Sequence, residues 1–163
     1  MNVLVINAGS SSLKYQLLDV DTGEVFAKGN CERIGIDGSF IGHQERGGEK
    51  ERLVVDLPDH KTAVKHVFEI IDGLGLPVDG IGHRVVQGGW YFPESAVVDD
   101  EVLAKVREVA PLAPLHNYAE ADVVEICREL YPSLGNVIVP DTAFHYNMPE
   151  RAWRYALPRD VVD

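Results

Sequence analysis

The sequence predicts an α/β fold with a mixed β-sheet, because two kinds of hydrophobic pattern follow one another along the chain. Short apolar or alternating runs bounded by turn residues dominate the first third, which favours consecutive antiparallel strands. Further along, runs with apolar residues three to four positions apart alternate with short apolar strands, which favours helical crossovers and parallel strands. At 163 residues and 45% hydrophobic residues, the chain can bury the core of one domain.

The first part of the chain is predicted to form strands joined by tight turns. Five segments carry strand patterns, at residues 3–6, 15–18, 25–27, 40–41 and 53–55. Turn-forming residues 19–23 separate the second segment from the third. The last two segments read as a hairpin whose tip is the polar stretch 44–49, a solvated charge cluster to which no function is assigned.

Three helices are predicted in the second part, where apolar residues keep a three-to-four spacing. The side chains expected to cap their N-termini are Asp59, Asp99 and Asn117. Short apolar strands are expected at 80–83, between the first two helices, and at 137–139, after the third. The predicted order is therefore several strands, then helix–strand–helix–helix–strand.

Composition limits the classes of partner. A net charge of −11 argues against nucleic acid or an anionic membrane, so an anionic ligand would have to meet a locally positive site. Cys31 and Cys127 lie far apart without metal-ligand spacing, and we expect buried free thiols in a reducing compartment. No apolar run approaches the ~18 residues of a membrane span, and the N-terminus lacks a signal-peptide layout, so a cytoplasmic protein is expected.

The first strand leads into a small, hydroxyl-rich segment, Asn7 to Lys14, that could hold a phosphate group. Small side chains allow backbone N–H groups to approach phosphate oxygens, the Ser10 and Ser12 hydroxyls add donors, and Lys14 adds a positive charge. The spacing differs from a P-loop, which requires Gly-Lys-Ser/Thr leading into a helix. An ordinary serine-rich hairpin is the equally weighted alternative.

Three further polar residues follow strands or precede helices, the usual location of ligands in open α/β sheets. Arg84 could grip a carboxylate or phosphate through two parallel hydrogen bonds, or pin a loop by donating to carbonyls. His116 precedes a helix, whose positive dipole end attracts anions, or is an ordinary surface histidine. Asp141 follows a buried strand and needs a cation or metal as partner, unless it caps the next turn.

Four motifs, NAGSSSLKY, GHRVVQGG, APLHN and DTAFHYNMPE, occur in an order and at intervals that resemble acetate kinase and its propionate and butyrate kinase relatives. The resemblance runs over the whole chain. It implies a ribonuclease-H-like domain of the actin, sugar kinase and Hsp70 superfamily, in which two related domains close over a nucleotide. It also implies reversible phosphoryl transfer from MgATP to acetate, giving acetyl phosphate and ADP.

The resemblance assigns roles to residues of the first motif. Asn7 occupies the position linked to magnesium, and Lys14 one linked to the nucleotide phosphates. Ser10 and Ser12 line the same turn.

The other motifs supply the acyl-substrate residues. By the same resemblance, Arg84 holds the substrate carboxylate or acyl phosphate, His116 donates to the phosphoryl group in flight, and Asp141 is the essential acid. Acetate is already ionised at pH 7 and needs no general base, so Asp141 is predicted to be a magnesium-shell or positioning group. Val86 and Leu115 are the candidate walls around the methyl group.

Family members continue for more than another such length beyond this sequence, and that part holds the adenosine site. We therefore expect residues 1–163 to be a single N-terminal, acyl-substrate domain that lacks its nucleotide domain and is incompetent alone, with that domain as its partner in cis or in trans. The alternative is a non-catalytic module that binds acyl phosphate or phosphate, or a subunit of a split enzyme. Two local departures are Gln87, where the family usually has histidine, and Tyr118, where it usually has proline; acetate and propionate stay open as substrates.

Overall fold

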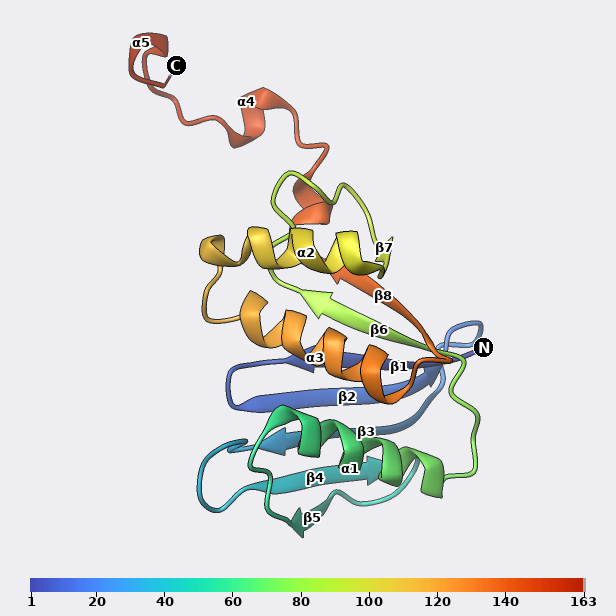
Figure 1. The fold of residues 1–163 in the computed structure, drawn as a ribbon. Helices are drawn as coiled ribbons and strands as arrows, with labels where there is room; N and C mark the ends of the chain where they lie inside the picture. Colours follow the sequence, from blue (N-terminus) through green and yellow to red (C-terminus); the bar gives the residue numbers. More distant parts are fainter. Residues whose placement is uncertain (163) are drawn as a thin grey trace.

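The computed structural model describes residues 1–162, and its β-strands form one mixed sheet. The strands are β1 (Asn2–Ala8), β2 (Ser12–Asp19), β3 (Val25–Glu32), β4 (Phe40–Glu45), β5 (Glu51–Val54), β6 (Gly80–Val85), β7 (Ala96–Val97) and β8 (Gly135–Pro140). Their order across the sheet is β5-β4-β3-β2-β1-β6-β8-β7 (Figure 1). The strand segments predicted from sequence are all present, and the two-residue β7 was not predicted because so short a strand leaves no periodic pattern.

The pairing of the strands confirms the predicted change from antiparallel to parallel. Strands β1 to β5 pair consecutively in antiparallel fashion. Strand β6 then lies parallel to β1, and β8 lies parallel to β6. The edge strand β7 is antiparallel to β8. Parallel neighbours require long crossovers, which here contain the helices.

The long helices are α1 (His60–Gly73), α2 (Asp100–Glu108) and α3 (Asn117–Leu130). Shorter helical turns are η1 (Ala110–Leu112), η2 (Asp141–His145), α4 (Glu150–Trp153) and α5 (Arg159–Val162). Asp59 and Asp99 cap α1 and α2 as predicted, because their carboxylates accept hydrogen bonds from the N–H groups of Thr62 and Val102. None of the helices within residues 1–162 has the length and apolarity needed to cross a membrane.

The predicted cap of the third helix is wrong. His116 occupies the N-cap position of α3 and makes no side-chain capping bond, whereas Asn117 is the first helical residue. The Asn117 side chain is fully buried and bonds instead to a loop beside the sheet. A partner in tertiary structure has therefore replaced the local capping interaction.

All three long helices lie over the same face of the sheet (Figure 1). The core forms between them, from alternate strand residues such as Leu4 and Leu13 packed with helix residues such as Val64 and Val67. Because neighbouring residues of a strand point to opposite faces, polar residues such as Lys14 project away from the helices. The sheet thus has one buried face and one face available to ligands or further structure.

Both cysteines are buried and unpaired, as predicted. Burial raises the pKa of the Cys31 and Cys127 thiols to about 12. Both thiols are therefore protonated at neutral pH and are poor nucleophiles.

Candidate functional site

Three predicted site residues meet at the carboxyl ends of the parallel strands. Asn7 lies near the end of β1, Arg84 near the end of β6, and Asp141 directly after β8. The strands run parallel and in register, with Ile6 opposite His83 and Val85 opposite Pro140. Their ends therefore coincide at one edge of the sheet, the location at which open α/β sheets bind ligands.

Arg84 and Asp141 form a multidentate ion pair. The Nε atom of Arg84 donates to Oδ1 and Oδ2 of Asp141 at 3.0 and 3.1 Å, and Nη2 donates to Oδ2 at 2.6 Å. Nη1 lies 3.5 Å from Oδ1 of Asn7. The hydrogen bonds to Asp141 raise the pKa of Arg84, so the guanidinium stays charged. Both side chains of the ion pair are 43% exposed, which leaves the cation accessible to an anionic ligand.

The contacts of these two side chains differ from those of the structural alternatives, while their roles in ligand binding stay predictions. Within residues 1–162, Arg84 donates to side chains and to no backbone carbonyl, so it does not serve to pin a loop. Asp141 makes no side-chain capping bond, although it begins η2. Its partner is the Arg84 guanidinium, a cation, although the carboxylate itself is partly exposed.

The turn between β1 and β2 is the predicted hairpin. The Gly9 N–H donates to the Ser12 carbonyl at 2.8 Å, and the Ser10 side chain is exposed. The Nε2 atom of His60, at the start of α1, donates to the Gly9 carbonyl at 2.8 Å. This hydrogen bond joins the turn to a helix residue 51 positions away in sequence, and local sequence patterns do not predict it. Phosphate binding at this turn stays a prediction.

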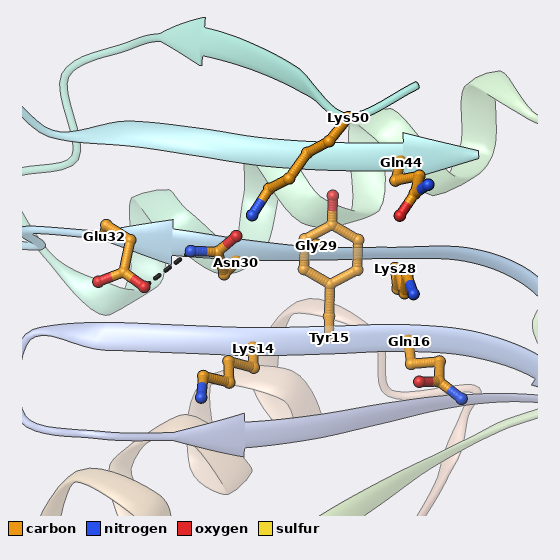
Figure 2. Close-up of a pocket in the computed structure, with 9 residues that line it drawn as sticks. All are labelled: Lys14, Tyr15, Gln16, Lys28, Gly29, Asn30, Glu32, Gln44 and Lys50. Carbon is orange, nitrogen blue, oxygen red and sulfur yellow. Dashed lines mark hydrogen bonds between the residues drawn. The ribbon is translucent and has the colours of Figure 1, made fainter. Parts of the chain in front are cut away.

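Lys14 lies within β2 rather than in the turn, directly opposite Asn7 of β1. Its exposed side chain points away from the helices and lines a groove of about 490 Å³ across β2, β3 and β4. Figure 2 shows Lys28 and Lys50 in the same groove, with the amide side chains of Gln16, Asn30 and Gln44. Within residues 1–162, none of the three lysines lies within 4.0 Å of a carboxylate. Glu32 also lines the groove, so three lysines and one carboxylate give it a net positive charge within an acidic chain.

The loop after β6 is held by side chains from two elements distant in sequence. Asn117 accepts from the Gln87 N–H at 3.0 Å and donates to the Gln87 carbonyl at 2.7 Å. The Oε2 atom of Glu120 accepts from the Val86 N–H at 2.9 Å. Thr142, in η2, accepts from the Gly88 N–H at 3.0 Å. These bonds define the course of the chain immediately after Arg84.

Gln87, one of the departures from the family pattern, helps to close this loop. Its Oε1 atom accepts from the Gly89 N–H at 2.8 Å. Gly89 has φ +58°, and a Cβ there would lie 2.6 Å from Cγ1 of Val109, so only glycine fits. The side chain of Gln87 therefore stabilises the loop through a hydrogen bond to the backbone two residues further along.

The remaining predicted residues lie around the start of α3. His116 is exposed and directly precedes the helix, as the dipole argument expected. Val86 is half-buried, whereas Leu115 is 75% exposed, so the wall predicted at Leu115 is open to solvent here. Tyr118, the second departure, is 46% exposed in the first turn of α3, and the helix begins regularly without a proline.

Sequence reasoning missed Glu120 and mistook the role of Asn117. One signal was present: Glu120, Val124 and Cys127 keep the helical spacing and are all buried, so a carboxylate occupies an apolar position. Within residues 1–162 there is no cluster of three or more His, Cys, Asp or Glu side chains that could hold a metal ion.

Replacing Asn117 with Ala should destabilise the fold by about 2 kcal/mol, because two backbone groups of Gln87 lose their partners. The measurement is urea unfolding of both proteins at neutral pH. Asp122→Ala, which removes an exposed carboxylate of the same helix, is the matched control and should cost less than about 1 kcal/mol. Equal stability of Asn117→Ala and the unaltered chain would contradict the loop-holding role.

Known protein families and curated sequences include clear matches to this chain. The sequence model of the Acetokinase family matches residues 2–163. Acetate kinase of Thermoanaerobacter pseudethanolicus is 46% identical over 170 residues, and that of Agathobacter rectalis is 49% identical over 173 residues. Both alignments cover all of this chain and 42% and 43% of the relatives. The chain thus spans less than half the length of these curated relatives.

Solved structures show the same fold. The crystal structure of Porphyromonas gingivalis acetate kinase superposes with a TM-score of 0.90 at 44% identity, over 98% of this chain and 42% of that one. A propionate kinase from Francisella tularensis superposes with a TM-score of 0.89 at 31% identity, over 99% and 42%. The mixed sheet with its helical layer is therefore the predicted fold of the actin, sugar kinase and Hsp70 superfamily.

Proposed function

The chain belongs to the acetate kinase family, and from this premise we propose that it is the acyl-substrate domain of an enzyme that transfers a phosphoryl group between MgATP and acetate. The observation that carries the proposal is the exposed Arg84–Asp141 pair beside Asn7, at the carboxyl ends of three parallel strands. In the proposed reaction, acetate and ATP give acetyl phosphate and ADP. Turnover also needs groups from a nucleotide domain, in cis or in trans.

Arg84 is proposed to bind the substrate carboxylate or acyl phosphate. Its guanidinium is held on one side by Asp141, and it is partly exposed, so an anion can approach its remaining N–H groups. Acetate and a phosphoryl group repel each other as anions, and a fixed positive charge between them lowers that barrier. The half-buried Val86 is proposed to contact the methyl group.

The donor set at the strand ends fits magnesium in part. Mg²⁺ prefers oxygen ligands and is usually bound through one or two protein oxygens plus substrate phosphates and water. Asn7 Oδ1 and the Asp141 carboxylate both contact Arg84, so two such oxygens lie on either side of one guanidinium. When bound, magnesium would neutralise charge on the phosphate oxygens. Asn7 and Asp141 would orient it, and Asp141 also holds Arg84.

The β1–β2 hairpin and the start of α3 are proposed to contact the phosphoryl group. Ser10 and Ser12 can donate hydroxyl hydrogen bonds, and Lys14 lies opposite Asn7 on the exposed face of the sheet. His116 stands at the positive end of the α3 dipole and could donate a ring N–H to the phosphoryl group in flight.

The test is phosphorus NMR of the purified chain with magnesium and ATP, with and without acetate, followed by addition of acetyl phosphate. We expect no turnover by the chain alone and shifted or broadened phosphorus lines with acetyl phosphate. Acetyl phosphate formation by the chain alone would contradict the need for a second domain. Lines unaffected by acetyl phosphate would contradict the acyl-substrate site itself.

Asp141→Asn should uncouple magnesium from the substrate site. The amide keeps one acceptor for Arg84 and loses the charge that attracts magnesium, so acetyl phosphate binding without metal should stay within about fivefold. Any strengthening of that binding by magnesium should disappear. Titrations with and without magnesium measure both effects, with Asp122→Asn as the control at an exposed carboxylate. Complete loss of metal-free binding would instead show that Asp141 acts through Arg84 alone.

A further inference from the structure

Glu120 is a buried carboxylic acid beside the proposed site, and the roles derived above do not use it. It lies one helical turn into α3 and is only 2% exposed. Its Oε2 atom accepts from the Val86 N–H at 2.9 Å, and Val86 is two residues beyond Arg84. The contact joins positions 34 residues apart in sequence. Glu120 thus connects the helical layer to the segment that carries the anion-binding arginine.

This placement is costly to the fold. Burial raises the pKa of the Glu120 carboxyl, while the Val86 N–H and the positive charge of Arg84 act in the opposite direction. Its second oxygen, Oε1, is buried and has no hydrogen-bond partner within residues 1–162. A hydrocarbon side chain at this position would avoid both penalties. The carboxyl group does, however, supply the acceptor that the Val86 N–H needs, which a hydrocarbon side chain could not.

The charged groups that act on Glu120 come from three elements around the proposed site. They are Arg84 of β6, His116 at the start of α3, and Asp141 of η2. All three are among the residues proposed above to meet the substrate or its metal. Glu120 therefore lies within electrostatic reach of these three residues, from a buried position where solvent screens it little.

Asn117, in the same turn of α3 as Glu120, also holds the loop that follows Arg84. Asn117 holds both backbone polar groups of Gln87, and Glu120 holds the N–H of the preceding residue, Val86. One turn of α3 thus binds three backbone groups of two consecutive residues. Removal of Asn117 would free Gln87, whereas removal of Glu120 would free the residue nearer to Arg84.

We propose that Glu120 is a positioning residue whose carboxyl group fixes the backbone of Val86, and thereby places Arg84 and the wall formed by Val86 for an acyl phosphate ligand. The inference rests on the proposed function of the site. It requires a hydrogen-bond acceptor at position 120 and no negative charge, so the neutral isostere Gln serves as well as Glu. An apolar residue does not.

The experiment compares the unaltered chain with Glu120→Ala and Glu120→Gln. Acetyl phosphate is titrated against each protein and followed by phosphorus and amide NMR, and hydrogen exchange of the Val86 amide is measured without ligand. Glu129→Gln is the matched control, because Glu129 lies on the same helix and is 61% exposed. Exchange of the Val124 amide inside α3 reports whether each variant is folded.

Glu120→Ala should bind acetyl phosphate about tenfold more weakly and lose protection at Val86, since one buried hydrogen bond is removed. Glu120→Gln should stay within about twofold of the unaltered chain in both measurements, because its carbonyl accepts the same bond.

Three results would overturn the inference. Unchanged binding by a folded Glu120→Ala variant would remove the positioning role and leave the proposed function intact. Weak binding by a folded Glu120→Gln variant, equal to that of Glu120→Ala, would assign the effect to charge. Absence of acetyl phosphate binding by the unaltered chain, with Val86 protected as expected, would overturn the proposed function and with it the substrate role of Glu120.

Discussion

Arg84→Ala is expected to weaken acetyl phosphate binding by at least about 100-fold, because charge-assisted hydrogen bonds to an anion are about twice as strong as neutral ones. The variant also leaves the Asp141 carboxylate without its cation, which adds repulsion toward any anionic ligand. Arg84→Lys should recover only part of the affinity, since an ammonium group cannot bond to Asp141 and the ligand in the same planar arrangement.

The measurement is a titration with acetyl phosphate at constant ionic strength, because screening alters any charge-based affinity. Arg107→Ala is the matched control, because Arg107 of α2 is also paired with carboxylates, Asp122 and Glu125 of α3, and lies outside the proposed site. That variant should bind as the unaltered chain does. Comparable losses in both variants would mean that net charge, rather than the position of Arg84, governs binding.

The fold should lose about 3 kcal/mol of stability between pH 6.5 and pH 4 through His83 alone. This histidine of β6 is 2% exposed and lies 2.8 Å from Asn136 Oδ1, to which Nε2 donates in the neutral form. Burial lowers the pKa of His83 to about 4. His83 therefore takes up a proton near pH 6.5 in the unfolded chain but only near pH 4 in the folded chain. Between these two values the free energy of unfolding falls by about 1.4 kcal/mol per pH unit.

The sign follows from this proton balance. His83 costs nothing above pH 6.5, where it is neutral in both states, and the loss grows as the pH falls and then levels off below about 4. Urea unfolding across this range tests the prediction, with His83→Gln expected to flatten the pH dependence. His145→Gln, at an exposed histidine of η2, is the matched control for the loss of one histidine. A parallel fall in stability for His83→Gln and the unaltered chain would exclude His83 as the cause.

Much of the architecture was readable from local patterns. Helix capping by Asp59 and Asp99, the hairpin after β1 and the change from antiparallel to parallel strands follow from turn chemistry and hydrophobic period. The order of four motifs was enough to indicate the family. Both kinds of signal act over a few residues, or depend only on their order, and neither requires knowledge of which elements touch.

The sequence predicted the candidate site less completely than it predicted the fold. Arg84, Asp141 and Asn7 were named from their positions after strands, and the structure brings them together because parallel strands in register end at one edge. Leu115 was proposed as a wall around the methyl group once the family resemblance was known, and its side chain is open to solvent. A position beside a strand end or a helix start thus indicates proximity to the site, but not which way the side chain is buried.

What the sequence by itself determined is the set of elements, their order and the chemistry of the residues at the strand ends, because these depend on local spacing and residue type. What only the tertiary structure decided is the partner of each polar side chain. Asn117 bonds to the backbone of Gln87, 30 residues away, instead of capping α3 as predicted. Glu120 accepts a hydrogen bond from the Val86 N–H, 34 residues away. The physical reason is that a buried polar group must find a hydrogen-bond partner wherever packing places one, and packing is set by contacts distant in the chain.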